Sequence, residues 1–121
     1  MSQRRQPTSD PARAGRDAEA RARAYLEAYG LRTLAQNFRT RRGEIDLVMA
    51  DGAETVFVEV RYRSHPGFGG AAASVDARKR RRLRQAAAAW LSHRPARARF
   101  DVIATDGRTV DWVRDAFRDE A

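Results

Sequence analysis

Residues 43–63, GEIDLVMADGAETVFVEVRYR, decide the fold of this 121-residue chain. An apolar run over residues 45–50 is followed by the turn signal Asp51-Gly52 and by a second run, residues 55–60, that is rich in β-branched side chains. Two such runs joined by a short turn are typical of a β-hairpin. Because apolar residues occupy both faces of the second run, we expect it to be a central strand of a sheet.

Two carboxylates interrupt the predicted hairpin, Asp46 in its first strand and Glu59 in its second. With the turn centred between Gly52 and Ala53, Asp46 lies directly opposite Glu59, roughly 5 Å away between the Cβ atoms. Arg61 follows on the face of Glu59, because side chains two residues apart on a strand point the same way. Two negative charges at this distance repel each other, and a divalent cation is the simplest group that neutralises them.

The composition of the chain is that of a soluble globular protein with one core. No apolar run approaches the ~20 residues of a membrane span, and the first residues lack the apolar core of a secretory signal, so we expect a cytoplasmic protein without a membrane partner. Since the chain has no cysteine, disulfides and thiolate metal sites are excluded. We expect residues 1–9 to form a disordered basic tail and residues 10–121 to form a single domain.

Positive charge is concentrated in one segment of the chain. The formal net charge is +8, and residues 77–100 contain nine Lys or Arg and no Asp or Glu, which leaves −1 for the rest. A basic element on a near-neutral body predicts binding to a polyanion such as nucleic acid. The alternative is a solvated helix face in a chain whose basic residues are arginine with one exception. The candidate nucleic-acid-binding residues are Arg78, Lys79, Arg80, Arg81, Arg82 and Arg84.

The remaining sequence predicts helices on both sides of this hairpin and further strands. Helices are expected over residues 10–29, 74–92 and 115–119, and strands over residues 31–39, 99–105 and 108–113. Asp10 is the expected cap of the first helix and Ser74 that of the second, while Gly30 ends the first. The order α-β-β-β-α-β-β, with a short terminal helix, predicts an α/β fold with a mixed central sheet flanked by helices.

Both long helices show an apolar stripe at helical spacing. The residues expected to face the core are Ala18, Ala22, Tyr25, Leu26 and Tyr29 in the first helix and Val75, Leu83, Ala86, Ala87 and Trp90 in the second. Lys79 falls on the second stripe, where it either extends along the sheet surface or reaches the two carboxylates. Glu19 lies at the edge of the first stripe and is either a residue favoured by the helix dipole or a third functional acid.

The spacing of Asp46, Glu59 and Arg61 matches the needs of phosphodiester hydrolysis. That reaction uses metal ions held by carboxylates and a cation that stabilises the charge developing on the phosphate. Asp46 and Glu59 supply carboxylates, the carbonyl group of Val60 is a further candidate ligand, and Arg61 supplies the cation. The alternative is a structural ion pair, but burying three ionic groups costs several kcal/mol unless all are satisfied.

Further segments occur in a characteristic order along the chain. They are Gly15-x-x-Ala18-Glu19, Gly43-Glu-Ile-Asp-Leu-Val, Phe57-Val-Glu-Val-Arg-Tyr-Arg63, Phe68-Gly-Gly-Ala-Ala-Ala-Ser-Val75, Lys79, Arg99-Phe-Asp-Val102 and Asp111-Trp-Val-Arg-Asp-Ala-Phe117. Over about residues 15–119 the chain resembles the YraN family. These uncharacterised bacterial proteins are related to Holliday-junction resolvases within the restriction-endonuclease-like PD-(D/E)xK superfamily.

The resemblance implies a restriction-endonuclease-like fold and a nuclease that uses Mg²⁺ or Mn²⁺. Asp46 and Glu59 match the metal-binding acids of the superfamily, and Glu19 matches the acid on the first helix of the resolvase branch. Arg61 stands where the superfamily has its catalytic lysine. An arginine stabilises negative charge, but with a pKa above ~12 it does not transfer protons. Lys79 is the candidate to take that place in space.

Three functions remain open at this point. The first is a metal-dependent endonuclease that acts on structured or branched DNA, and the second is a non-catalytic nucleic-acid-binding module with a degenerate nuclease site. The third is an assembly protein whose basic helix binds an acidic protein partner. The resemblance to junction resolvases, which cut two strands symmetrically, also implies a homodimer.

Overall fold

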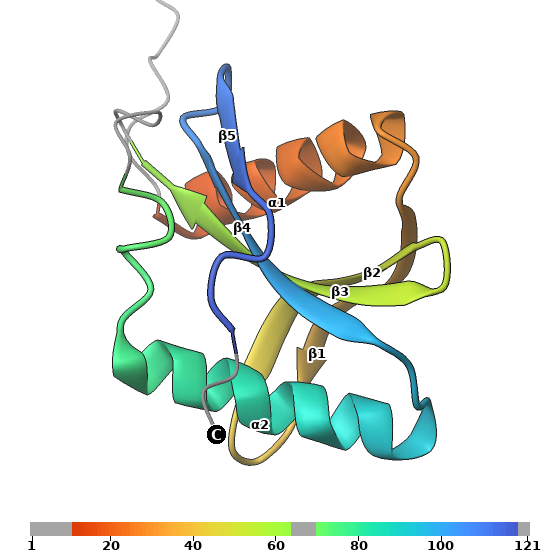
Figure 1. The fold of residues 1–121 in the computed structure, drawn as a ribbon. Helices are drawn as coiled ribbons and strands as arrows, with labels where there is room; N and C mark the ends of the chain where they lie inside the picture. The colour runs from red at the N-terminus through yellow and green to blue at the C-terminus, as the bar shows by residue number, and fades with distance from the viewer. Residues whose placement is uncertain (1–10, 64–69, 119–121) are drawn as a thin grey trace, which may run out of the picture.

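The computed structural model describes residues 11–63 and 70–118 of the chain (Figure 1). The elements follow the predicted order α-β-β-β-α-β-β. They are α1 (Pro11–Ala28), β1 (Arg32–Arg39), β2 (Glu44–Asp51), β3 (Glu54–Tyr62), α2 (Ala77–His93), β4 (Ala98–Thr105) and β5 (Val110–Val113). Among the described residues, neither helix combines the length and apolar character needed to cross a membrane. The predicted tail over residues 1–9 lies outside the described part of the chain.

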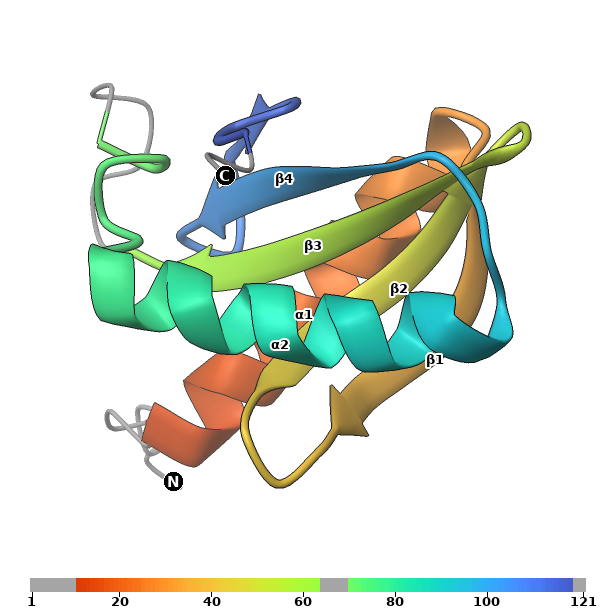
Figure 2. The same cartoon turned by 60° about the horizontal axis from the view of Figure 1, so that its bottom comes forward.

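The five strands form one mixed sheet in the order β1-β2-β3-β4-β5. β3 and β4 are parallel, whereas all other neighbouring strands are antiparallel. α2 connects the parallel pair across one face of the sheet, and α1 covers the opposite face (Figures 1 and 2). This is the predicted α/β architecture, and it is consistent with a restriction-endonuclease-like fold.

Each face of the sheet buries its own apolar layer. The buried residues beneath α1 are Ala22, Leu26, Leu31, Leu47, Met49, Val56, Val58 and Ile103. Those beneath α2 include Phe57, Val75, Leu83, Ala86, Ala87, Trp90 and Val102, which confirms the predicted stripe of the second helix. The prediction that Tyr29 of the first helix faces the core was wrong, because the residue is 60% exposed. Its ring contacts Tyr25 and Trp112 at the surface, beyond the last buried turn of α1.

The ends of the helices follow local hydrogen-bonding rules. Gly30 has φ 98°, and the Gly30 and Leu31 N–H groups donate to the carbonyls of Glu27 and Leu26, which is a glycine C-cap. The predicted cap of the second helix was wrong. Asp76 caps α2 by accepting a hydrogen bond from the backbone N–H of Lys79, because the helix begins later than the Ser74 cap requires.

The C-terminal segment does not form the helix predicted over residues 115–119 in its described part. The backbone N–H of Asp115 donates to Oδ1 of Asp101 at 2.9 Å. The backbone N–H of Ala116 donates to the carbonyl of Phe100 at 2.7 Å. These two bonds hold the segment against β4. The N–H groups that donate in them are not available for the hydrogen bonds of a helix.

Candidate functional site

The two predicted carboxylates lie where the β2–β3 ladder ends. The last backbone pair is Leu47 with Val58, and the same register continued by one residue brings Asp46 opposite Glu59, as the predicted turn requires. Beyond this pair, Oδ2 of Asp46 accepts a hydrogen bond from the backbone N–H of Val60 at 2.8 Å. The Asp46 side chain therefore closes the end of the ladder and lies beside the Glu59 carboxyl group.

The backbone of β2 departs from regular alternation around Asp46. Ile45 and Val48 are three residues apart, and both pack in the layer beneath α2. Leu47 packs beneath α1. Strict alternation would place Ile45 and Leu47 on one face, but the two side chains pack in different layers. Asp46 lies between them, and its carboxylate accepts the hydrogen bond from Val60 on the neighbouring strand.

Asp46 and Glu59 form a pair of neighbouring carboxyl groups, of which Asp46 is half-buried and Glu59 is buried. Glu59 is 3% exposed. Burial raises the pKa of Glu59 to about 8, and the charge of Asp46 adds to the rise. Burial also raises the pKa of Asp46, while hydrogen bonds from Val60 and Glu59 oppose that rise. Both shifts favour protonation of the pair, and Glu59 is the acid whose pKa is raised above neutral pH.

Two cationic side chains approach the same oxygen of Glu59. Nζ of Lys79 lies 3.5 Å from Oε2, and Nε of Arg61 lies 3.7 Å from it. Arg61 also donates from Nη2 to the carbonyl oxygen of Ser74 at 2.9 Å, which ties its guanidinium to the segment before α2. Of the two interpretations of Lys79, the structure supports the one in which its ammonium group reaches the acid pair.

The donor set of the acid pair fits a divalent cation. When Glu59 is ionised, its Oε1 atom is a buried oxygen to which no described group donates a hydrogen bond. A buried oxygen without a partner carries its full desolvation penalty. Mg²⁺ binds oxygen ligands through one or two carboxylates and keeps several water molecules. Asp46 and Glu59 are therefore the residues that would hold such an ion.

Glu19 extends the acidic cluster from α1. Burial raises the pKa of the half-buried Glu19, and the charge of Asp46 raises it further. Asn37 forms a side-chain hydrogen bond with Glu19 and has φ 52°, a left-handed conformation that asparagine tolerates better than most residues. Asn37 was not among the site residues predicted from the sequence. An asparagine inside a strand-forming segment was the available signal, because asparagine is depleted in strands.

The predicted metal ligands differ in how closely they approach one another. Within residues 11–63 and 70–118, no three His, Asp or Glu side chains lie in an arrangement that coordinates a metal ion. Asp46 and Glu59 interact directly, whereas Glu19 is linked to the pair only through the charge of Asp46, which raises the pKa of Glu19. Val60 offers its N–H to Asp46, and the role of its carbonyl group stays a prediction.

The predicted nucleic-acid-binding arginines of α2 divide into two groups. Arg78, Arg81 and Arg82 are exposed. Arg80 and Arg84 instead lie over the ring of Phe117, with Arg80 Cζ 4.8 Å from the ring centre. Arg80 also donates to the carbonyl of Val75, and Arg84 to that of Arg118. These two side chains anchor neighbouring segments of the protein, so the exposed basic face is narrower than the sequence predicted.

A positively charged hollow opens next to the acid pair. Its volume is about 270 Å³, and its lining residues are Arg61, Asp76, Arg78, Lys79 and Arg82. Arg61 and Lys79 are thus shared between the hollow and the acid pair. Asp76 is occupied as the cap of α2. An anion in this hollow would contact several cations and lie beside the two carboxyl groups.

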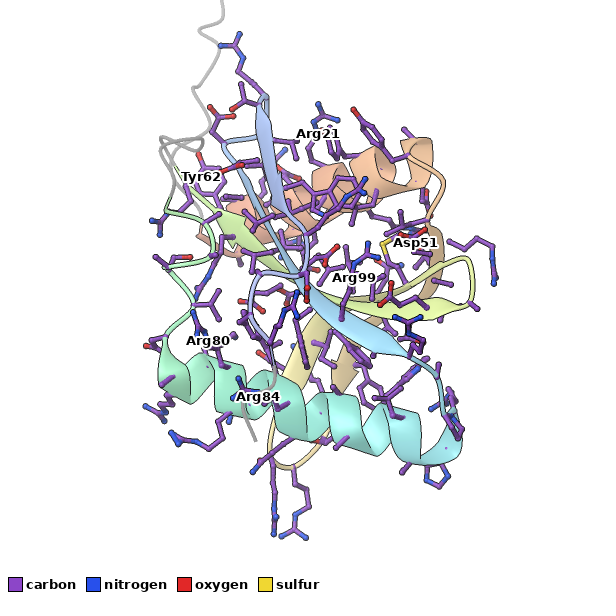
Figure 3. All side chains as sticks on the ribbon, in the orientation of Figure 1. Arg21, Asp51, Tyr62, Arg80, Arg84 and Arg99 are labelled. Atoms are coloured by element: carbon purple, nitrogen blue, oxygen red, sulfur yellow. The ribbon has the colours of Figure 1, made fainter. Side chains whose placement is uncertain are left out.

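A second charged network serves a structural purpose. Asp101 is fully buried and accepts hydrogen bonds from Arg99, from Nε1 of Trp112 and from the backbone of Asp115. Arg99 also donates to Asp51 at 3.0 Å (Figure 3) and to Glu54 at 2.9 Å. Arg99 is therefore neutralised by three carboxylates and does not belong to the basic surface that the charge count suggested.

Comparison with known proteins identifies close relatives over most of the chain. Residues 18–105 match the uncharacterised protein family UPF0102. A UPF0102 protein of Halorhodospira halophila is 71% identical over 113 residues, which cover 93% of each chain. A UPF0102 protein of Pseudomonas putida is 48% identical over 120 residues, covering 92% of this chain and 98% of the relative. The UPF0102 protein YraN of Escherichia coli is 49% identical over 108 residues, covering 85% and 82%.

Proposed function

The chain belongs to the uncharacterised protein family UPF0102, together with the YraN proteins, and we propose that it is a metal-dependent endonuclease that hydrolyses phosphodiester bonds in DNA. The observation that carries this proposal is the pair formed by half-buried Asp46 and buried Glu59 beside a hollow lined by cations. Two like-charged acids in contact inside a protein are costly. A catalytic metal site accounts for that cost. A purely structural ion pair would be expected to satisfy every carboxylate oxygen, but Oε1 of Glu59 has no hydrogen-bond partner among the described residues.

The arrangement gives each polar group a task in hydrolysis. A divalent cation, Mg²⁺ or Mn²⁺, would polarise the phosphate and supply a nucleophilic hydroxide when bound to Asp46 and Glu59. Lys79 and Arg61 stabilise negative charge that develops on the phosphate, because both reach the hollow and the acid pair. Glu19 adds negative charge near Asp46 and favours a cation there.

The exposed arginines of α2 supply affinity for the phosphate backbone. Arg78, Arg81 and Arg82 are exposed, and none of them takes part in an ion pair within residues 11–63 and 70–118. The residues of α2 include no Asp or Glu that would repel a polyanion. The preference for structured or branched DNA, a homodimer and a cytoplasmic location remain expectations from the sequence.

A cleavage assay tests the proposed activity. Purified protein is incubated with branched, single-stranded and duplex DNA in Mg²⁺, in Mn²⁺ and in EDTA. We expect metal-dependent cleavage of at least one substrate, and we expect Asp46→Asn to abolish it. Cleavage that persists in Asp46→Asn, or that persists in EDTA, would overturn the assignment of this site.

One observation favours a second function, a nucleic-acid-binding module without turnover. The sequence resembles a superfamily that has a lysine at the position of Arg61. The guanidinium of Arg61 donates a hydrogen bond to the carbonyl of Ser74. A module of this kind binds DNA with a steep dependence on salt and cleaves nothing in any metal. Arg61→Lys separates the two functions: a wild-type cleavage rate that changes in this variant shows that the site is catalytic, whereas no cleavage by either protein supports the binding module.

A further inference from the structure

A second hollow lies beyond the candidate site along α2. Arg78, Arg82, Gln85 and Ala89 recur at helical spacing and form one stripe of the helix. The first two line the hollow beside the acid pair, and the last two line another hollow of about 520 Å³. Its lining residues are Thr40, Arg41, Arg42, Gln85, Ala88 and Ala89. From Lys79 to Ala89 the helix rises by about 15 Å, which is a span of a few nucleotides.

The far wall of this hollow is the turn between β1 and β2, which is held in place. Oγ1 of Thr40 accepts hydrogen bonds from the backbone N–H groups of Arg42 and Gly43, and the Thr40 N–H donates to the Gly43 carbonyl. A Cβ atom added at Gly43 would lie 1.8 Å from the carbonyl oxygen of Arg82. The turn therefore packs directly on the α2 backbone, and both views show it beside the middle of that helix (Figures 1 and 2).

The lining of this hollow combines an apolar floor with a cationic rim. Ala88 and Ala89 present methyl groups, and Gln85 adds an amide that both donates and accepts. Arg41 and Arg42 are exposed, and neither takes part in an ion pair with any residue of 11–63 and 70–118. Phosphate groups need cations and gain nothing from an apolar floor. A nucleobase uses both features, because its face packs on apolar groups and on guanidinium planes.

We propose that this hollow binds an unpaired nucleotide of the same strand whose phosphate reaches the acid pair. The proposal rests on the proposed function and specifies the substrate as a strand with unpaired bases next to the cleavage position. In a duplex, the faces of the bases are covered by their neighbours, so only an unstacked base enters such a hollow. Arg41 or Arg42 covers one face of this base, and the floor of Ala88 and Ala89 covers the other.

Binding in EDTA tests the proposal without depending on cleavage. The probe is a fluorescein-labelled oligonucleotide, used as a single strand and as a blunt duplex of the same sequence, with fluorescence polarisation as the readout. Ala88→Phe fills the hollow without changing charge, and Ala53→Phe at the exposed β2–β3 turn is its matched control. We expect Ala88→Phe to weaken single-strand binding by about tenfold or more and duplex binding by less than about twofold. Thermal melts check that both variants fold.

Three results would overturn the proposal. Equal weakening of both probes makes the hollow part of a general phosphate surface, and unchanged binding removes it from the interface. Displacement of the single strand by a polyglutamate peptide as readily as by unlabelled DNA assigns the hollow to an acidic protein partner.

A second variant, Gln85→Ala, removes the amide while leaving the helix intact. We expect it, too, to weaken binding of the single strand more than binding of the duplex. Metal-dependent cleavage of duplex DNA by Ala88→Phe would support the proposed nuclease function even if the hollow binds no nucleotide.

Discussion

Nζ of Lys79 on α2 lies 3.5 Å from Oε2 of Glu59 on β3. Arg61 follows Glu59 on the strand and also faces it, at 3.7 Å, but its Nη2 atom is committed to the carbonyl of Ser74. A lysine has a compact, mobile ammonium group with three donors, whereas the arginine fork is fixed once one arm is bonded. The cation that responds to charge at the acid pair is therefore Lys79, supplied by the helix.

This relationship predicts an unequal effect of removing the two cations. Lys79→Met is expected to lower the kcat of DNA cleavage by roughly 10²–10³-fold, the cost of one lost electrostatic donor. Arg61→Met is expected to cost less, because part of that side chain serves to anchor the segment before α2. Single-turnover cleavage with saturating enzyme measures both. A Lys79→Met protein that cleaves at the wild-type rate while Arg61→Met is inactive would reverse the assignment.

The acid pair predicts that stability falls as pH rises. Burial, and then the charge of Asp46, raises the pKa of Glu59 to about 8 in the folded protein, against 4.5 as its ordinary value. Between these two pH values the folded state holds a proton that the unfolded chain has lost. The free energy of unfolding therefore declines from pH 4.5 to pH 8 and levels off above that. Urea titrations in EDTA across this range measure the decline.

Glu59→Gln is the control for the pH profile. Glutamine keeps the shape of the side chain and cannot ionise, so its unfolding free energy is expected to depend less steeply on pH than that of the wild type. Above pH 8 the variant is expected to be the more stable of the two proteins, because it carries no ionised group at this buried position. Parallel profiles for the two proteins would mean that Glu59 titrates normally.

The contact between Gly43 and α2 predicts a large effect of a single methyl group. Gly43→Ala places Cβ 1.8 Å from the Arg82 carbonyl oxygen, so we expect it to lower the unfolding free energy by about 1–3 kcal/mol. Gly15→Ala is the matched control, because no atom lies within 4 Å of the added Cβ atom. Alanine in α1 is expected to raise stability by about 0.5–1 kcal/mol. Thermal melts followed by circular dichroism distinguish these opposite signs.

The network around Asp101 predicts a stability defect that is separate from activity. Asp101→Asn replaces a buried acceptor of Arg99 and Trp112 with a group that also donates, and we expect a loss of about 3–5 kcal/mol. Asp51→Asn removes a partly exposed partner of the same arginine and is expected to cost less than about 1 kcal/mol. Urea unfolding measures both, and equal costs would contradict a buried network centred on Asp101.

The order of elements and the central hairpin were predictable because local sequence determines them. Alternating and β-branched runs specify strands, Asp51-Gly52 specifies the turn, and that turn sets the register that brings Asp46 opposite Glu59. Gly30 ends α1 as expected. Each of these features depends on residues that are neighbours in the chain, so no knowledge of the tertiary structure is needed.

Features that depend on distant segments were harder to predict. The arginines at 80 and 84 looked like binding residues, but the C-terminal segment returns over α2 and packs Phe117 against them. That return also replaces the expected terminal helix with hydrogen bonds to β4. Arg99 contributed to the positive charge count, yet Asp51, Glu54 and Asp101 surround it. A charge count along the sequence takes no account of partners that only folding provides.

The candidate site itself was partly predictable. Spacing found Asp46 and Glu59, and the helical stripe left two alternatives for Lys79, of which the structure supports contact with Glu59. Asn37 was missed, because its importance lies in a left-handed backbone conformation and in a hydrogen bond to Glu19 on another element. Its short amide side chain alone does not reveal either property.

The central claim is that Asp46 and Glu59 hold a divalent metal ion. The most direct measurement is anomalous scattering from crystals grown with Mn²⁺ above pH 8, the value to which the pKa of Glu59 is raised. We predict one strong peak bonded to both carboxylates in the wild type and no peak at this position in Asp46→Asn. Manganese bound elsewhere on the protein, with the acid pair still holding only Lys79 and Arg61, would contradict the account.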